Sequence, residues 1–113
     1  LSPSQISALT SIERHGPMTL GQLAEHERVA PPSITRVVDK LVERGLVVRV
    51  PDPVDRRVTR VSTTPAGDTL LADVRVRKDL WLAARLAGLD DDQRARLAAA
   101  LDVIDALTSR ERV

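Results

Sequence analysis

The chain has 113 residues, 42% of them hydrophobic and 29% charged, and a net charge of +1, which is the composition of a small globular protein and not of a disordered one. It contains no Cys, which excludes disulfides, thiolate zinc sites and redox sensing through thiols. No apolar run is long enough to span a membrane and no signal peptide is visible, so we expect a cytoplasmic protein without a membrane partner.

The first part of the chain is expected to form two helices separated by a short strand. A capping box at Ser2–Gln5 predicts a first helix, which ends where His15–Pro17 interrupts the pattern. Met18–Leu20 is a short run that suits a single strand pairing. A second capping box, at Thr19–Gln22, predicts a short helix that runs to about Arg28.

A third helix is predicted from about Pro32 to Arg44, after a break at Val29–Pro32. Its apolar residues recur with helical spacing and form one stripe: Ile34, Val37, Val38, Leu41 and Val42. Gly45 is expected to end this helix in the left-handed conformation.

Two β runs follow, Leu46–Val50 and Val58–Thr63, and the loop Pro51–Arg57 separates them. The loop is too long for a tight turn and two prolines stiffen it. A hairpin of this kind after three short helices predicts the wing of a winged helix-turn-helix.

Two long helices are predicted at the end, Thr64–Leu86 and Asp90–Ser109, the second opened by another capping box. Their apolar side chains are spaced for helix packing: Leu70, Leu71, Val74, Trp81 and Leu82, then Leu97, Leu101, Ile104 and Leu107. We therefore predict a mainly α fold with a small β wing (α+β). Residues 1–64 would form a DNA-binding winged helix-turn-helix domain, and residues 65–113 a helical dimerisation region.

In a helix-turn-helix, the second helix enters the major groove and its N-terminal residues contact base edges. The residues at that end are Pro32, Ser33, Thr35 and Arg36. The Arg36 guanidinium can donate two hydrogen bonds to guanine O6 and N7. The alternative is that Ser33 and Thr35 only cap the helix and that Arg36 is a solvated charge. Three further basic residues are predicted as phosphate contacts or as surface charges: Lys40, Arg49 and Arg60.

The loop carries Asp55, Arg56 and Arg57, and arginines on a wing suit the negative potential of a narrow minor groove. Asp55 is placed to hold the Arg57 guanidinium through paired hydrogen bonds. From Arg28 to Arg60 the chain has eight basic and four acidic residues, an excess expected of a surface that faces phosphate. The alternative is a surface hairpin with solvated charges.

Three stretches, Pro32–Val47, Asp52–Arg57 and Thr64–Gly67, resemble the multiple antibiotic resistance regulator (MarR) family over about residues 2–110. The resemblance implies a triangular homodimer on a pseudo-palindromic operator, with Ser33, Thr35 and Arg36 on the recognition helix and Asp55 and Arg57 on the wing. This sequence has Thr63 where the family usually has Leu. It also has no counterpart of the family's first helix, which contributes to the dimer interface and is expected upstream.

The resemblance further implies a small aromatic acid or phenol as an effector, although no residue pattern identifies its pocket. Arg14, His15 and Trp81 are candidate pocket residues that can equally be structural. No metal, cofactor or enzymatic activity is expected, because the chain lacks a Gly-rich phosphate loop, metal-ligand spacing and a nucleophile with a nearby base. Its two His residues are expected to be isolated, and Asp90–Asp92 is expected to be a helix cap.

The sequence therefore predicts a transcriptional repressor that binds specific double-stranded DNA as a homodimer. The alternative is a winged-helix module that docks other proteins and has no role in DNA binding.

Overall fold

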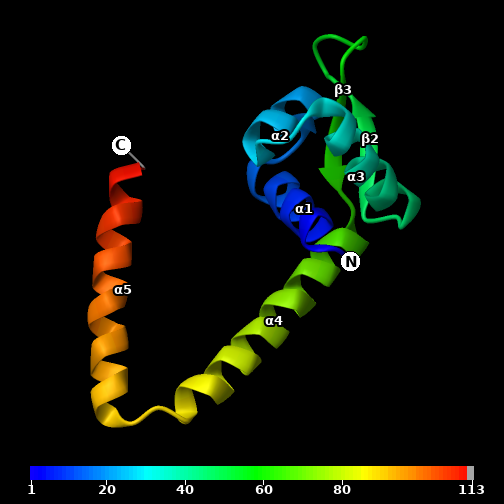
Figure 1. Cartoon of the computed structure of the whole chain (residues 1–113). Helices are drawn as coiled ribbons and strands as arrows, with labels where there is room; N and C mark the ends of the chain where they lie inside the picture. Colours follow the sequence, from blue (N-terminus) through cyan, green and yellow to red (C-terminus); the bar gives the residue numbers. More distant parts are fainter. Residues whose placement is uncertain (112–113) are drawn as a thin grey trace. The chain divides into compact units, whose positions relative to one another are not determined.

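The computed structural model describes residues 1–111, which form five helices and a three-stranded sheet (Figure 1). The elements are α1 (Pro3–His15), β1 (Met18–Thr19), α2 (Leu20–Glu27), α3 (Pro31–Glu43), β2 (Val47–Pro51), β3 (Thr59–Thr63), α4 (Pro65–Ala87) and α5 (Asp91–Glu111). The chain divides into two compact units, Leu1–Arg75 and a second that begins at Val76. The predicted fold class is confirmed: a mainly helical chain with a small antiparallel sheet.

The three predicted capping boxes are present and determine where α1, α2 and α5 begin. At α1 the Ser2 hydroxyl accepts the Gln5 N–H at 3.2 Å, and the Gln5 side chain accepts the Ser2 N–H at 3.0 Å. Thr19 with Gln22 and Asp90 with Gln93 make the same reciprocal pair. Each box satisfies two backbone donors that a helix start leaves open.

Helix α3 begins without such a cap, one residue earlier than predicted. Its N-cap is Ala30, whose side chain offers no acceptor, and its first residue is Pro31. Proline suits this position because it has no N–H to satisfy and its φ is already helical. The predicted left-handed Gly45 is confirmed, with φ of +74°. Arg28 at the end of α2 is also left-handed, with φ of 56°, and this was not predicted.

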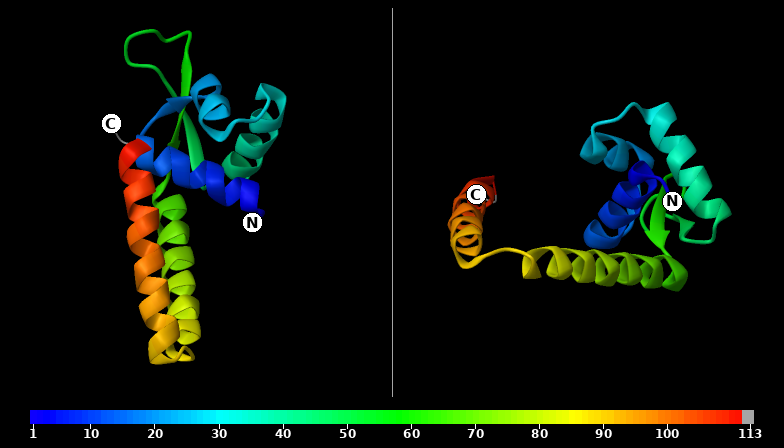
Figure 2. Two further views of the ribbon diagram at one scale, coloured as in Figure 1. Left: turned by 60° about the vertical axis from the view of Figure 1, so that its left-hand side comes forward. Right: turned by 60° about the horizontal axis from the view of Figure 1, so that its bottom comes forward.

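The sheet has the order β1-β3-β2, so β3 is the central strand. Met18 pairs with Val61 across β1 and β3, and Val47 pairs with Thr63 across β2 and β3. Both long strands begin one residue later than predicted. The left-hand view of Figure 2 shows the loop between β2 and β3 projecting beyond α2 and α3, as a wing does.

The core of the first unit is aliphatic and lies where α1, α2 and α3 meet the sheet. Its largest fully buried side chains are Leu9, Ile12, Leu23, Ile34, Val38, Leu41, Val61 and Leu71. Leu71 belongs to α4, so the beginning of that helix is anchored in this core. An ion pair between Arg75 and Glu13 adds a second link between α4 and α1.

The second unit buries little of its own apolar surface. Trp81 is 58% exposed, Leu101 is 50% exposed and Leu107 is 58% exposed. The Arg85 guanidinium lies 5.1 Å from the centre of the Trp81 ring, a cation–π contact. Among the described residues, no helix combines the length and apolar content needed to cross a bilayer.

Candidate nucleic-acid interface

One face of helix α3 packs against the core of the first unit, and the opposite face is exposed to solvent. Ile34, Val38 and Leu41 are buried within the first unit. Arg36 lies on the other side, Ser33 lies on the flank, and both are exposed. The helical period of 3.6 residues therefore separates an anchoring face from a face available to a ligand.

The predicted recognition residues differ in how free their polar groups are. The Thr35 hydroxyl donates to the Pro31 carbonyl at 3.0 Å, so its proton is used within the helix. Among the described side chains, which end at residue 107, none forms an ion pair or hydrogen bond with Arg36, whose side chain is exposed. Pro32 is exposed in the first turn, and Lys40 lies 3.7 Å from Glu43 in an exposed ion pair.

On the wing, Asp55 holds Arg57 as the sequence predicted. The Arg57 Nε and Nη2 atoms donate to the two Asp55 carboxylate oxygens at 3.0 and 3.1 Å, and the Arg57 backbone N–H also donates to Asp55. The guanidinium lowers the pKa of Asp55, and the carboxylate raises that of Arg57. The Arg57 side chain is nevertheless 91% exposed. Its charge is therefore fixed in direction while it remains open to a partner.

The base of the wing depends on Asp52, which the sequence analysis missed. The Asp52 carboxylate accepts the backbone N–H groups of Val54 at 3.0 Å and Asp55 at 2.8 Å, and it forms an ion pair with Arg60. The Arg60 hydrogen bond, followed by that of Asp55, lowers the pKa of Asp52. An Asp before a Pro at the start of a loop is a known turn signal and would have indicated this role.

Arg60, which was predicted as a phosphate contact or a surface charge, is engaged by other side chains and only partly exposed. Besides Asp52, its guanidinium reaches the side chain of Gln22 at 3.3 Å, and it is only 28% exposed. Arg49 is also engaged, in an ion pair with Asp39 of α3. These pairings connect residues distant in sequence, so a reading of local pattern could not detect them.

We expect Asp52→Asn to destabilise the chain at neutral pH, because the amide cannot form the ion pair with Arg60. The folded pKa of Asp52 is lowered, so its stabilising effect is present above the unfolded pKa and disappears as the pH falls through the folded value. The stability gap between wild type and variant should therefore narrow below about pH 4. Urea denaturation at several pH values measures the gap. A gap that does not change with pH would contradict this role.

The two His residues are not isolated, contrary to expectation. The ring centres of His15 and His26 lie 4.5 Å apart in an edge-to-face arrangement, because α1 and α2 pack together near their ends. In the part of the chain whose side chains are described, no three His, Cys, Asp or Glu residues gather to hold a metal ion.

Comparisons with known proteins identify the family. The MarR family model matches residues 1–59. An uncharacterised HTH-type transcriptional regulator of Mycobacterium bovis is 45% identical over 107 residues, covering 95% of this chain and 75% of the relative. The HTH-type transcriptional repressor MdtR of Bacillus subtilis is 29% identical over 98 residues, covering 87% of this chain and 63% of MdtR.

A similarity in structure agrees with the similarity in sequence. The crystal structure of RV1404 from Mycobacterium tuberculosis superposes with a TM-score of 0.87 at 27% identity, covering 96% of this chain and 74% of that one. The named relatives are regulators and not enzymes, in agreement with the prediction. With a winged helix-turn-helix, a matching family model and a relative this similar along its length, the chain belongs to the MarR family and is a transcriptional regulator of that type.

Proposed function

We propose that the chain represses transcription by binding duplex DNA through the exposed face of α3 and the wing. The observation that carries the proposal is the Arg57 guanidinium, which Asp55 orients while 91% of the side chain stays exposed. An arginine held in this way on a projecting hairpin can enter a minor groove without losing conformational freedom on binding. Arg36 on α3 is free to read a base in the major groove. The repressor role is supported by the likeness to MdtR.

We further propose that the protein acts as a homodimer built from α4 and α5. The apolar side chains of these helices remain exposed in one chain: Leu80 67%, Trp81 58%, Leu97 37%, Leu101 50% and Leu107 58%. Long helices that bury so little are marginal in water, and a second copy would cover these side chains. Two recognition helices related by a twofold axis would then suit a pseudo-palindromic operator, and a small effector would control binding.

A titration of mixed-sequence duplex at low salt, followed by filter binding, tests the DNA-binding function. We expect binding that weakens steeply as salt is added, because counterions are released from each neutralised phosphate. Absence of binding under these conditions would favour the protein-docking alternative. Sequencing of DNA fragments retained by the protein would then identify the operator.

We expect Arg57→Ala to weaken operator binding by roughly tenfold to a hundredfold, because a charged contact to DNA is lost. The salt dependence should flatten as well, by about 0.9 in the log–log slope for each phosphate contact removed. Affinities measured between low and moderate salt give both quantities. Arg14→Ala removes an exposed charge of α1 that belongs to neither α3 nor the wing, so it is the control and should bind as the wild type does. An unchanged affinity and slope for Arg57→Ala would contradict the role of the wing.

For Arg36→Ala we expect a loss of discrimination at one or two base pairs of each half-site, by about 1–3 kcal/mol. A base contact contributes to the difference between sequences, whereas a phosphate contact contributes equally to all of them. The measurement is binding to a set of operators with single base changes. An equal loss on every operator would assign Arg36 to the phosphate backbone instead.

A further inference from the structure

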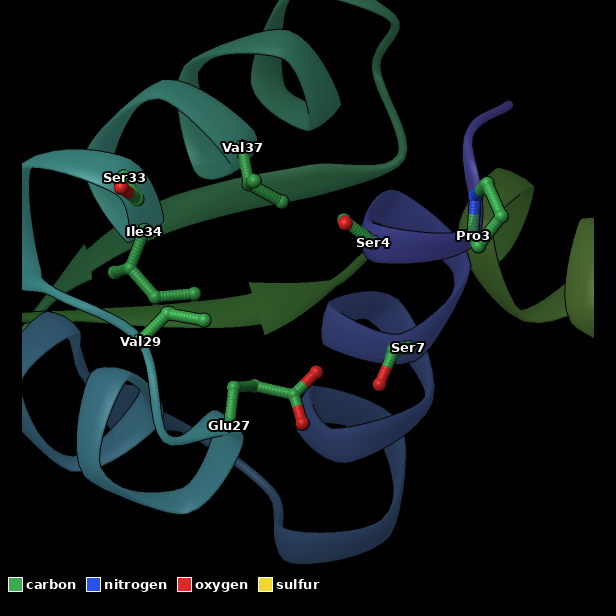
Figure 3. Close-up of a pocket in the computed structure, with 8 residues that line it drawn as sticks. All are labelled: Pro3, Ser4, Ser7, Glu27, Val29, Ser33, Ile34 and Val37. Atoms are coloured by element: carbon green, nitrogen blue, oxygen red, sulfur yellow. The ribbon is translucent and has the colours of Figure 1, made fainter.

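A cavity of about 340 Å³ lies between the beginning of α1, the end of α2 and the first half of α3 (Figure 3). Its apolar wall is formed by Val29, Ile34 and Val37. The volume is at the lower end of the range for small-molecule sites, and an apolar wall with a few polar groups is their usual composition. The cavity lies entirely within the first unit, so it is formed by one chain without a partner.

The charged group of this cavity is the Glu27 carboxylate. Glu27 is half-buried, and within the described part of the chain no ion pair or hydrogen bond engages its side chain. None of the residues that line the cavity is basic. Glu27 is also the last residue of α2, where the helix dipole is negative and favours a cation. A cation beside this carboxylate would be favourable, because the side chain is partly buried and lies at the negative end of the α2 helix dipole.

We infer that the cavity binds a small organic cation with an apolar body. Its ammonium group would pair with Glu27, which Figure 3 shows extending from the end of α2 towards α1. The hydroxyls of Ser4 and Ser7, on the α1 side, offer acceptors for the remaining N–H groups. The apolar body would cover Val29 and Ile34. An aromatic acid of similar size would be repelled by the same carboxylate, so the cavity distinguishes ligands by charge.

The cavity also reaches the proposed DNA-binding face, because Ser33 in the first turn of α3 is one of its lining residues. A ligand seated against Ser33 would compete with DNA for this residue. The cation therefore acts as an effector that weakens DNA binding. This second step depends on the proposed function, whereas ligand binding itself does not.

Calorimetric titration of the free protein tests the cavity, with 2-phenylethylamine as the cationic probe and 3-phenylpropanoate as the anionic one. We expect the amine to bind and the acid not to bind. Glu27→Gln keeps the size of the side chain and removes its charge, so the amine should bind about tenfold more weakly, the range of a charge-assisted hydrogen bond. Glu25→Gln is the matched control, because this exposed carboxylate of α2 does not line the cavity. Circular dichroism verifies the fold of both variants.

Three results would contradict the site. They are equal binding of the amine and the acid, no binding of either, and an unchanged affinity for the amine in Glu27→Gln. The effector role is tested by duplex titration with and without the amine, against an equal concentration of sodium chloride. We expect weaker duplex binding in the wild type and no effect in Glu27→Gln. If the chain does not bind duplex at all, the proposed function fails while calorimetry still decides the cavity. If the amine binds and duplex affinity is unchanged, the effector role is rejected.

Discussion

Gly67→Ala is expected to lower the free energy of unfolding by roughly 2–4 kcal/mol, at or beyond the upper end of what overpacking usually costs. A Cβ at this position would lie 2.3 Å from the Leu46 carbonyl oxygen and 3.4 Å from a methyl group of Leu9. The first of these neighbours is backbone, so it cannot move aside as a flexible side chain would. The beginning of α4 would have to shift away from the core instead.

That shift would break the contacts by which α4 is joined to the end of α3. The Thr64 N–H donates to the Leu46 carbonyl at 3.1 Å, and the Thr64 hydroxyl donates to the Gly45 carbonyl at 2.6 Å. The same hydroxyl accepts the Gly67 N–H at 3.2 Å. A displaced helix would lose this set of bonds together, which is why the expected cost exceeds that of a simple steric contact.

Urea denaturation followed by circular dichroism measures the change, and Gly21→Ala is the matched control. Gly21 lies in α2, and the nearest atom to an added Cβ is the Thr19 hydroxyl oxygen at 3.9 Å. There the substitution should be neutral or stabilise the chain by up to about 1 kcal/mol, because alanine favours a helix over glycine. Equal stability of the two variants would contradict the close contact between Gly67 and Leu46.

The double variant Leu97→Asp with Leu101→Asp is expected to dissociate the proposed dimer. Both leucines are exposed in one chain and lie four residues apart on one face of α5. A twofold interface uses each substitution twice, so four apolar contacts would be replaced by charges. At about 1.5 kcal/mol for each leucine, the dissociation constant should rise by three orders of magnitude or more.

Sedimentation over a range of protein concentrations measures the dissociation constant. Ala99→Asp is the control, because it adds an Asp on the opposite face of α5 and should leave assembly unchanged. Circular dichroism should report a folded first unit in all variants, since these positions lie outside it. A wild-type chain that is monomeric at micromolar concentration would contradict the dimer itself.

The features that the sequence predicted well are those encoded by neighbouring residues. In each capping box, Ser2 with Gln5 and Thr19 with Gln22, the two residues are three positions apart. The beginnings of α1 and α2 could therefore be predicted from the local sequence. The pair of Asp55 and Arg57 is equally local. Each of these contacts depends on a short segment adopting one conformation, and the residue types in the segment favour it.

The features that the sequence did not predict depend on the tertiary fold. The contact of Arg60 with Gln22 joins residues 38 positions apart, and it turns a predicted surface charge into a structural group. His15 and His26 meet only because α1 packs on α2. Arg28 has a left-handed backbone conformation, although no glycine marks this position in the sequence. Hydrogen bonds from its backbone N–H to the carbonyls of Ala24 and Glu25 stabilise this conformation. Such contacts follow from packing, which no pattern of residue types specifies.

The absence of aromatic residues from the core has a consequence for spectroscopy. Trp81 is the only fluorophore of the chain, which has no Tyr and no Phe, and it lies in the second unit, 58% exposed. Melting of the aliphatic core therefore releases no buried indole, because none is packed there. Burial of the same ring by a second copy would shift its emission to shorter wavelength. If the proposed dimer forms, intrinsic fluorescence would report its association, whereas melting of the core has to be followed through the backbone.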